Sequence, residues 1–151
     1  MKRTILNFLL FALCFTACKK DNDGNPELAL PIISNLEIGI NNNESAIIGK
    51  DFHFNAEVLV SGKIEDVQVK ILPRSGENYS KVWSHQITWD QYKDAKNTTV
   101  HKHFYIPTNA AEGKYDFVII VNDQNGTHLE VKKSLTIYTE ANAPDSIELE
   151  H

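Results

Sequence analysis

Hydrophobic and polar residues alternate along much of the chain after residue 30, with the period of two that is typical of β-strands. The alternation is clearest over residues 51–60, where every second side chain is apolar: Phe52, Phe54, Ala56, Val58 and Val60. Because successive side chains of a strand point to opposite faces, this segment is expected to present one apolar face to a core.

Similar patterns predict strands over residues 31–40, 67–73, 82–89 and 99–106. A final hairpin is expected over residues 115–138, because Asn125-Gly126 favours the positive φ of a tight turn. The inner stripe of its first strand would be Tyr115, Phe117, Ile119 and Val121. Residues 90–97 are the one segment with helical character, for about one or two turns. These short strands predict an all-β fold, an Ig-like antiparallel β-sandwich of about seven strands over residues 30–140.

The N-terminal residues have a different pattern, which predicts a lipoprotein signal peptide over residues 1–17. Lys2 and Arg3 precede an apolar stretch that is too short to cross a bilayer. The small Ala17 then precedes Cys18, the residue expected to carry lipid; a plain secretory leader is the alternative. Residues 18–29 comprise this cysteine and a polar, flexible tether, and several acyl chains on Cys18 would anchor the protein stably to a membrane.

Lysine followed by acidic residues just after Cys18 resembles the surface-export signal of Bacteroidetes lipoproteins. We therefore expect a cell-envelope protein that is lipid-anchored to the outer membrane, with surface exposure as a further expectation. Residues 141–151 form a polar tail that ends in Leu149-Glu150-His151, which resembles the start of a vector-derived tag. His151 is accordingly not counted as a ligand.

Charge and cysteine content narrow the functional classes. Without Lys2 and Arg3 of the leader, the chain has 13 basic and 20 acidic residues, which gives a net charge of −7. This negative charge argues against nucleic acid as a partner. The two cysteines, Cys14 and Cys18, both belong to the leader and its anchor, so we expect no disulfide and no thiol nucleophile in the exported domain. Motifs of hydrolases, metalloproteases and nucleotide-binding enzymes are absent from the sequence, so an enzyme is not expected.

The segment "HKHFYIPTNAAEGKYDFVIIVNDQNGT" resembles a Bacteroidetes lipoprotein family known as domain of unknown function 4625, in its histidine-rich strand, Ile-Pro, Ala-x-Gly-x-Tyr and Val-x-Asp-x-x-Gly. Residues 49–58 and 67–83 resemble earlier strands of the same family. The resemblance implies a histidine-rich, Ig-like domain without an assigned activity. This chain departs from the family pattern at residues 71–74 and at Asp116, where family members tend to carry further histidines.

Histidines on one strand suggest a metal site. His101 and His103 are two residues apart in a predicted strand, so both rings should lie on one face and could reach a single zinc or copper ion. A third ligand must then come from a neighbouring strand, with His53, His85 and Asp116 as candidates. Asp116 would lie beside His103 if the strand ending at Ile106 paired with the one starting at Tyr115. The alternative is a solvated outer face without metal.

Aromatic residues offer a second candidate site. Trp83 and Trp89 could stack on a sugar ring, although aromatic residues at strand spacing more often pack in a core. The leading interpretation is thus a lipid-anchored, non-catalytic binding or accessory module, whose partner, a protein or a glycan, is unknown, and no cofactor is expected. The alternative is a lipoprotein that binds zinc or copper through strand histidines.

Overall fold

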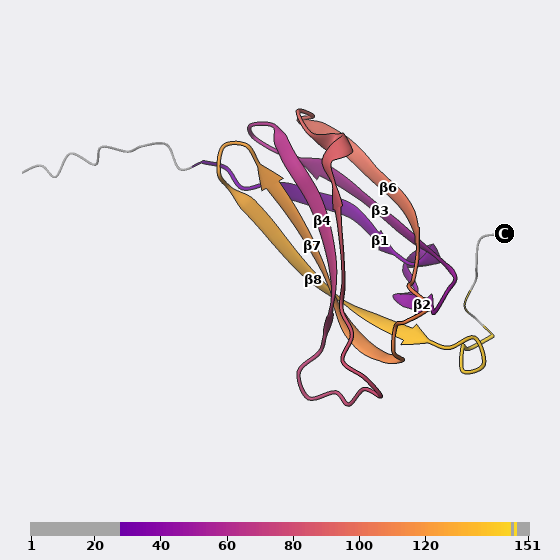
Figure 1. Ribbon diagram of the computed structural model, residues 1–151. Helices are drawn as coiled ribbons and strands as arrows, with labels where there is room; N and C mark the ends of the chain where they lie inside the picture. Colours follow the sequence, from indigo (N-terminus) through magenta and orange to yellow (C-terminus); the bar gives the residue numbers. More distant parts are fainter. Residues whose placement is uncertain (1–27, 146, 148–151) are drawn as a thin grey trace, which may run out of the picture.

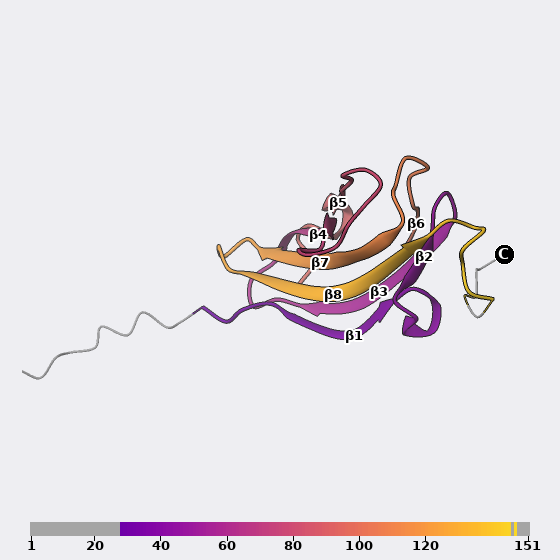
Figure 2. The ribbon, with the colours of Figure 1, turned by 90° about the horizontal axis from the view of Figure 1, so that it is seen from below.

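The alternating segments form the strands of two β-sheets that pack face to face in the computed structural model, which describes residues 28–145 and 147 (Figures 1 and 2). The strands are β1 (Ile32–Ile38), β2 (Ser45–Ile47), β3 (Asp51–Leu59), β4 (Ile64–Pro73), β5 (His85–Trp89), β6 (Asn97–Tyr105), β7 (Gly113–Asp123) and β8 (His128–Tyr138). The predicted all-β sandwich is confirmed, with eight strands in the described part of the chain. The additional strand, β2, is too short to show a period in the sequence.

One sheet has the order β1-β3-β6 and the other β2-β8-β7-β4-β5. Neighbouring strands are antiparallel, except that β2 runs parallel to β8. Figure 2 shows the sheets as two layers, with β1 and β3 in one and β4, β5 and β7 in the other. The sheet order separates β6 from β7, although these two strands follow one another in the sequence.

Aromatic side chains join the two sheets in the core. The ring of Phe117 on β7 lies 5.7 Å from the rings of both Phe52 and Phe54 on β3, measured between centroids. All three residues are buried, as are the other members of the predicted inner stripes. The period of two in the sequence therefore identified the core-facing sides of β3 and β7.

Two turns at one end of the sandwich are held together by the buried carboxylate of Asp123. It accepts hydrogen bonds from the backbone N–H groups of Gly62 (2.9 Å), Lys63 (3.1 Å) and Asn125 (3.1 Å). A Cβ atom on residue 62 would lie only 2.4 Å from Asp123 Oδ1, so this turn requires glycine. Burial raises the pKa of Asp123, but the hydrogen bonds outweigh it and hold the pKa below its ordinary value.

The remaining expectations concern the helical segment and the chain ends. Residues 90–97 contain one 3₁₀ turn, η2 (Asp90–Tyr92), in the place where a short helix was predicted. Within residues 28–145 and 147, no helix is long and apolar enough to cross a membrane. The predicted signal peptide, Cys18 and the tag remnant lie outside the described residues.

Candidate metal centre

Three histidines meet on the outer face of the three-stranded sheet. In the β3–β6 ladder His53 is the direct partner of His103, and His101 projects from the same face of β6. These positions follow from the alternation, which turns Val100, Lys102 and Phe104 inward and leaves the histidines of β6 outward. The structure thus supplies from β3 the third imidazole that the pair on β6 requires.

The ring nitrogens are spaced as the ligands of one metal ion would be. His53 Nδ1 lies 3.3 Å from His103 Nε2, and His101 Nε2 lies 3.1 Å from the same atom. One nitrogen from each ring falls within 4.8 Å of the other two. Ligands about 2.0–2.1 Å from a tetrahedral zinc ion are about 3.3–3.4 Å apart, so small shifts of exposed rings would complete the coordination.

Carboxylates contact the opposite sides of two of these rings. Asp51 Oδ2 lies 2.6 Å from His103 Nδ1, and Glu37 Oε2 lies 3.3 Å from His53 Nε2. An ionised carboxylate only accepts hydrogen bonds, so each contact favours a proton on the outer nitrogen. The nitrogen that faces the other histidines then carries a lone pair, which is the tautomer that ligates a metal.

This arrangement brings electron-rich atoms together. With the outer nitrogens protonated, the inner nitrogens of His53 and His103 face each other as two acceptors at 3.3 Å. Two lone pairs at that distance repel unless a cation lies between them. A proton on His101 Nε2 can satisfy His103, whereas a metal ion would satisfy all three rings at once. The three rings are therefore arranged so that one cation could be held between them.

The two carboxylates are the functional residues that the sequence interpretation missed. Asp51 could have been found, because it precedes His53 by two residues and must share its face of the strand. Glu37 could not, because its position depends on the pairing of β1 with β3 and on the irregular register between Ser34 and Glu37.

The structure separates His85 and Asp116 from this cluster, so both were wrong as partners of His101 and His103. His85 lies on β5 in the other sheet, where its ring stacks on Trp83 at 6.0 Å and burial lowers its pKa. The expected pairing of β6 with the strand after it is also wrong, because β6 pairs with β3 while β7 pairs with β4 and β8. The physical reason is that the chain crosses between sheets after Ile106.

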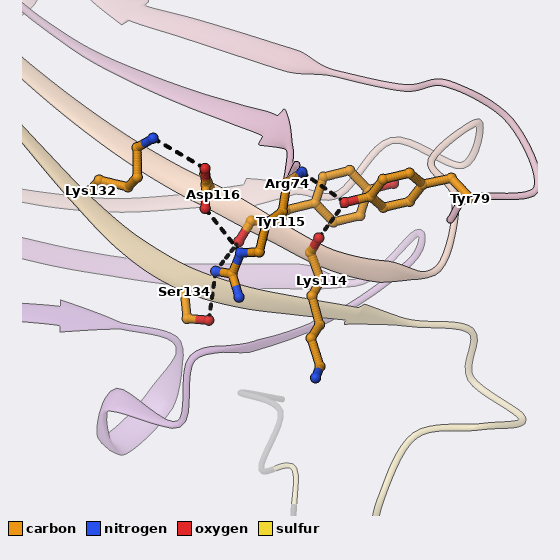
Figure 3. Close-up of polar contacts among 7 residues, drawn as sticks. All are labelled: Arg74, Tyr79, Lys114, Tyr115, Asp116, Lys132 and Ser134. Atoms are coloured by element: carbon orange, nitrogen blue, oxygen red, sulfur yellow. Dashed lines mark hydrogen bonds and ion pairs between the residues drawn. The ribbon is translucent and has the colours of Figure 1, made fainter. Parts of the chain in front are cut away.

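Asp116 instead belongs to a network on the five-stranded sheet (Figure 3). Its carboxylate accepts a hydrogen bond from Arg74 Nε at 3.0 Å and forms an ion pair with Lys132 Nζ at 3.2 Å. Burial raises the pKa of Asp116, but these two cations outweigh it and lower the pKa below its ordinary value. The guanidinium also donates to the Tyr115 carbonyl (3.0 Å) and to Ser134 Oγ (2.8 Å).

Tyr79 completes this network from the connection between β4 and β5 (Figure 3). Its hydroxyl accepts a hydrogen bond from the backbone N–H of Arg74 at 2.8 Å and donates one to the carbonyl of Lys114. These bonds fix the long β4–β5 connection to β7. Asp116 binds the same Arg74, so it has a structural role in this network.

Both tryptophans pack against other aromatic rings of the domain, which is the role that the sequence favoured over stacking on a sugar. Trp83 is only 7% exposed and packs edge-on against Tyr115, with 5.5 Å between ring centroids, so the stacking role considered for it is wrong. Trp89 is half-buried and stacks on Phe54 at 5.7 Å. The ammonium group of Lys102 lies over the Trp89 ring at 5.9 Å and over the Tyr92 ring at 5.3 Å. Trp83 is therefore part of the core, and Trp89 packs between the two sheets.

Comparisons with known proteins agree with the resemblance found in the sequence. The family described as "Domain of unknown function (DUF4625)" matches residues 16–138. No curated protein matches the sequence significantly.

Solved structures with similar backbones share little sequence with this chain. A Niemann-Pick type C2 protein from Japanese carpenter ant has 11% identity and a TM-score of 0.48, over 74% of this chain and 95% of its own. Spo0M, a sporulation control protein from Bacillus subtilis, has 11% identity and a TM-score of 0.42, over 73% and 50%. A non-cellulosomal cohesin from Archaeoglobus fulgidus has 13% identity and a TM-score of 0.33, over 73% and 92%.

Proposed function

Because the chain belongs to the DUF4625 family, whose description assigns no activity, we propose its function from the site itself: the domain binds one transition-metal ion, zinc or copper, through His53, His101 and His103. The observation that carries this proposal is the pair of carboxylates behind the rings. Asp51 and Glu37 favour the tautomers whose lone pairs converge on one point. A metal-binding role has named ligand atoms in the structure, whereas the protein- or glycan-binding role that the sequence left open has none.

The donor set supports zinc or copper over magnesium or calcium. Imidazole nitrogen suits zinc and copper, whereas the hard cations prefer carboxylate, carbonyl and water oxygens. Three protein ligands leave at least one coordination position for water or for a group from another molecule.

We assign binding rather than catalysis to this site. His101 and His103 are exposed on an open sheet face, and water has free access to that face. Catalytic metal sites gain much of their effect from excluding water around the reacting atoms. A metal held on an exposed face is better suited to capture and exchange.

The proposed setting of this module is the cell envelope of a Bacteroidetes-type bacterium, with an outer-membrane lipid anchor at Cys18. The support is the order of features in the sequence: a basic start, a short apolar stretch, a small residue and then cysteine. The polar residues that follow would separate the metal site from the membrane as a flexible tether.

Calorimetric titration with Zn²⁺ and Cu²⁺, on protein purified without a histidine tag, tests the metal site. We expect one ion per chain, bound with micromolar or tighter affinity. His101→Ala combined with His103→Ala should weaken binding at least 100-fold and leave the fold intact, because outward strand positions contribute little to packing. His128→Ala removes an exposed histidine from the other sheet and should have no effect.

The pH dependence of binding provides a second readout in the same titration. Affinity should fall as the solution becomes more acidic, because protons compete with the metal for the imidazole nitrogens. Wild-type protein that bound either metal only at millimolar concentration and without pH dependence would refute the proposal.

A further inference from the structure

Exposed aliphatic side chains gather at one end of the sandwich. Leu28, Leu30, Ile32 and Leu59 have exposed fractions of 53%, 59%, 56% and 44%. Ile32 and Leu59 are cross-strand partners on β1 and β3, and Leu30, Ile32 and Leu59 line a groove of about 220 Å³. We call these four residues the apolar end.

The apolar end lies where the described chain begins. The carbonyl of Ala29 accepts hydrogen bonds from Ser61 Oγ (3.1 Å) and Thr127 Oγ1 (3.4 Å), in the two turns that Asp123 joins. Figure 1 shows the chain entering the sandwich at the end that carries the β7–β8 hairpin. The apolar end is thus held to the body of the domain and is not a loose extension of it.

We propose that the apolar end docks on the lipid bilayer, with its four aliphatic side chains in the boundary between headgroups and acyl chains. The inference rests on the anchor at Cys18, which is part of the proposed function. Leu28 follows Cys18 by ten positions. A flexible tether of that length would have a root-mean-square span of about 16–19 Å, so the proposed anchor would hold this end close to the bilayer at high effective concentration.

The composition of the surface favours lipid over a protein partner. The apolar end consists of leucine and isoleucine, whereas protein interfaces concentrate aromatic residues, methionine and arginine at their centres. Lys96 lines the groove, and Lys63 lies in the adjoining turn with an exposed side chain. The Lys63 ammonium group also forms an exposed ion pair with Asp94 at 3.7 Å, which it could exchange for the phosphates of lipid headgroups.

Docking would also orient the metal site. Leu59 and His53 project from the same face of β3, six residues apart. At about 3.3 Å per residue the histidine lies roughly 20 Å from the apolar end, measured along the strand. The proposed metal centre would therefore lie beyond the headgroups, on the same face of β3 but at a distance from the docked end, and would stay open to the surrounding medium.

Nitroxide quenching on the lipidated full chain tests this inference. Leu30→Cys introduces a single free thiol, because the sulfur of Cys18 would carry lipid and the mature chain has no other cysteine. A fluorescent label at residue 30 is compared with the same label on Tyr105→Cys, which replaces a 70%-exposed residue near the histidines. Both proteins are placed in phosphatidylethanolamine–phosphatidylglycerol vesicles that contain spin-labelled lipid.

We expect the label at residue 30 to be quenched at least threefold more than the label at residue 105. Equal quenching of both labels in protein that sediments with the vesicles would overturn docking and leave the anchor intact. Protein that does not sediment with the vesicles would overturn the anchor and docking together. A label at residue 30 that is shielded in cell membranes but not in pure lipid would assign the apolar end to a protein partner, against this proposal. Zinc titration of the same variants reports separately on the metal site.

Discussion

Carboxylates that contact the outer nitrogens of two histidine rings bear on what the candidate centre could do at the scale of single residues. Asp51 orients His103 from within the same sheet, and Glu37 reaches His53 from the neighbouring strand. Carboxylates in this position raise the basicity of the ligating nitrogen and restrict rotation of the ring. They should therefore affect metal affinity without contacting the metal.

Asp51→Ala should weaken zinc or copper binding by roughly 10- to 100-fold, the usual effect of removing such a partner. Glu57→Ala is the matched control, because it removes the same charge from the same face of β3 and contacts none of the histidines. Titration of both variants with zinc or copper distinguishes the effect of losing the orientation of the His103 ring from the effect of losing one negative charge. Equal losses in both would show that charge alone accounts for the effect.

Asp123 shows how one buried carboxylate makes stability depend on pH. Its pKa is lower in the folded protein than in the unfolded chain, where a value of about 3.9 is ordinary. Its stabilising contribution is therefore complete above that range and is lost as the pH falls through the folded-state pKa.

Asp123→Ala should lower the free energy of unfolding by about 1–3 kcal/mol at pH 7, because backbone N–H groups would lose a buried acceptor. Urea unfolding from pH 7 to pH 3 should show the gap to wild type narrowing below about pH 4. Glu77→Gln, at an exposed position between β4 and β5, should match wild type throughout. A gap that stayed constant over this range would contradict the assigned role of the charge.

At the scale of elements, β7 is the strand on which the packing of the two sheets depends. It is paired on both sides, with β4 and β8, and its inner residues Tyr115, Phe117, Ile119 and Val121 are fully buried. Phe117 contacts the aromatic rings of the opposite sheet. Loss of this side chain would open a cavity between the layers.

Phe117→Ala should destabilise the domain by about 3–5 kcal/mol, which is enough to unfold a domain of ordinary stability. Lys114→Ala on the same strand is the control, and thermal and urea unfolding measure both variants. The side chain of Lys114 is exposed, and the backbone carbonyl of residue 114 would still accept the hydrogen bond from Tyr79 in this variant. A loss below about 1 kcal/mol for Phe117→Ala would mean that the sheets are held together elsewhere.

The sequence determines the faces of strands better than it determines their partners. Alternation alone showed that His101 and His103 share a face and that Phe52 and Phe117 point inward. Alternation could not show that β6 pairs with β3 and not with β7, because the sheet that a strand joins depends on packing between residues far apart in the sequence. Hence His53 remained one of several candidates in the sequence, and Asp116 was placed beside His103 in error.

At the scale of the whole molecule, the apolar end and the histidine cluster lie along one face of β3. In the sequence, the predicted tether comes before the apolar end, which begins at Leu28. The histidines lie further along the face of β3 that carries Leu59. In this order, the proposed membrane attachment and the proposed metal binding would use separate parts of one surface and would not compete.

Cys18→Ala should release the protein from the membrane fraction, because the acyl chains would be lost. Fractionation and labelled fatty acid incorporation measure the result, and Cys14→Ala is the control that should remain anchored. Fatty acid that still entered the Cys18→Ala variant would refute the assignment. Protease treatment of intact cells tests surface exposure separately, and full protection would place the domain on the inner side.

Lys102 has a consequence for how crowded copies of this domain coexist. Strands β5 and β6 border the open side of the sandwich, and edge strands invite pairing with another chain. The ammonium group of Lys102 points inward across this opening, over Trp89 and Tyr92. A second molecule that added a strand here would have to bury that charge or displace it from the rings. We therefore expect Lys102 to disfavour the addition of a strand at this edge, which would limit filament growth among crowded copies of the domain.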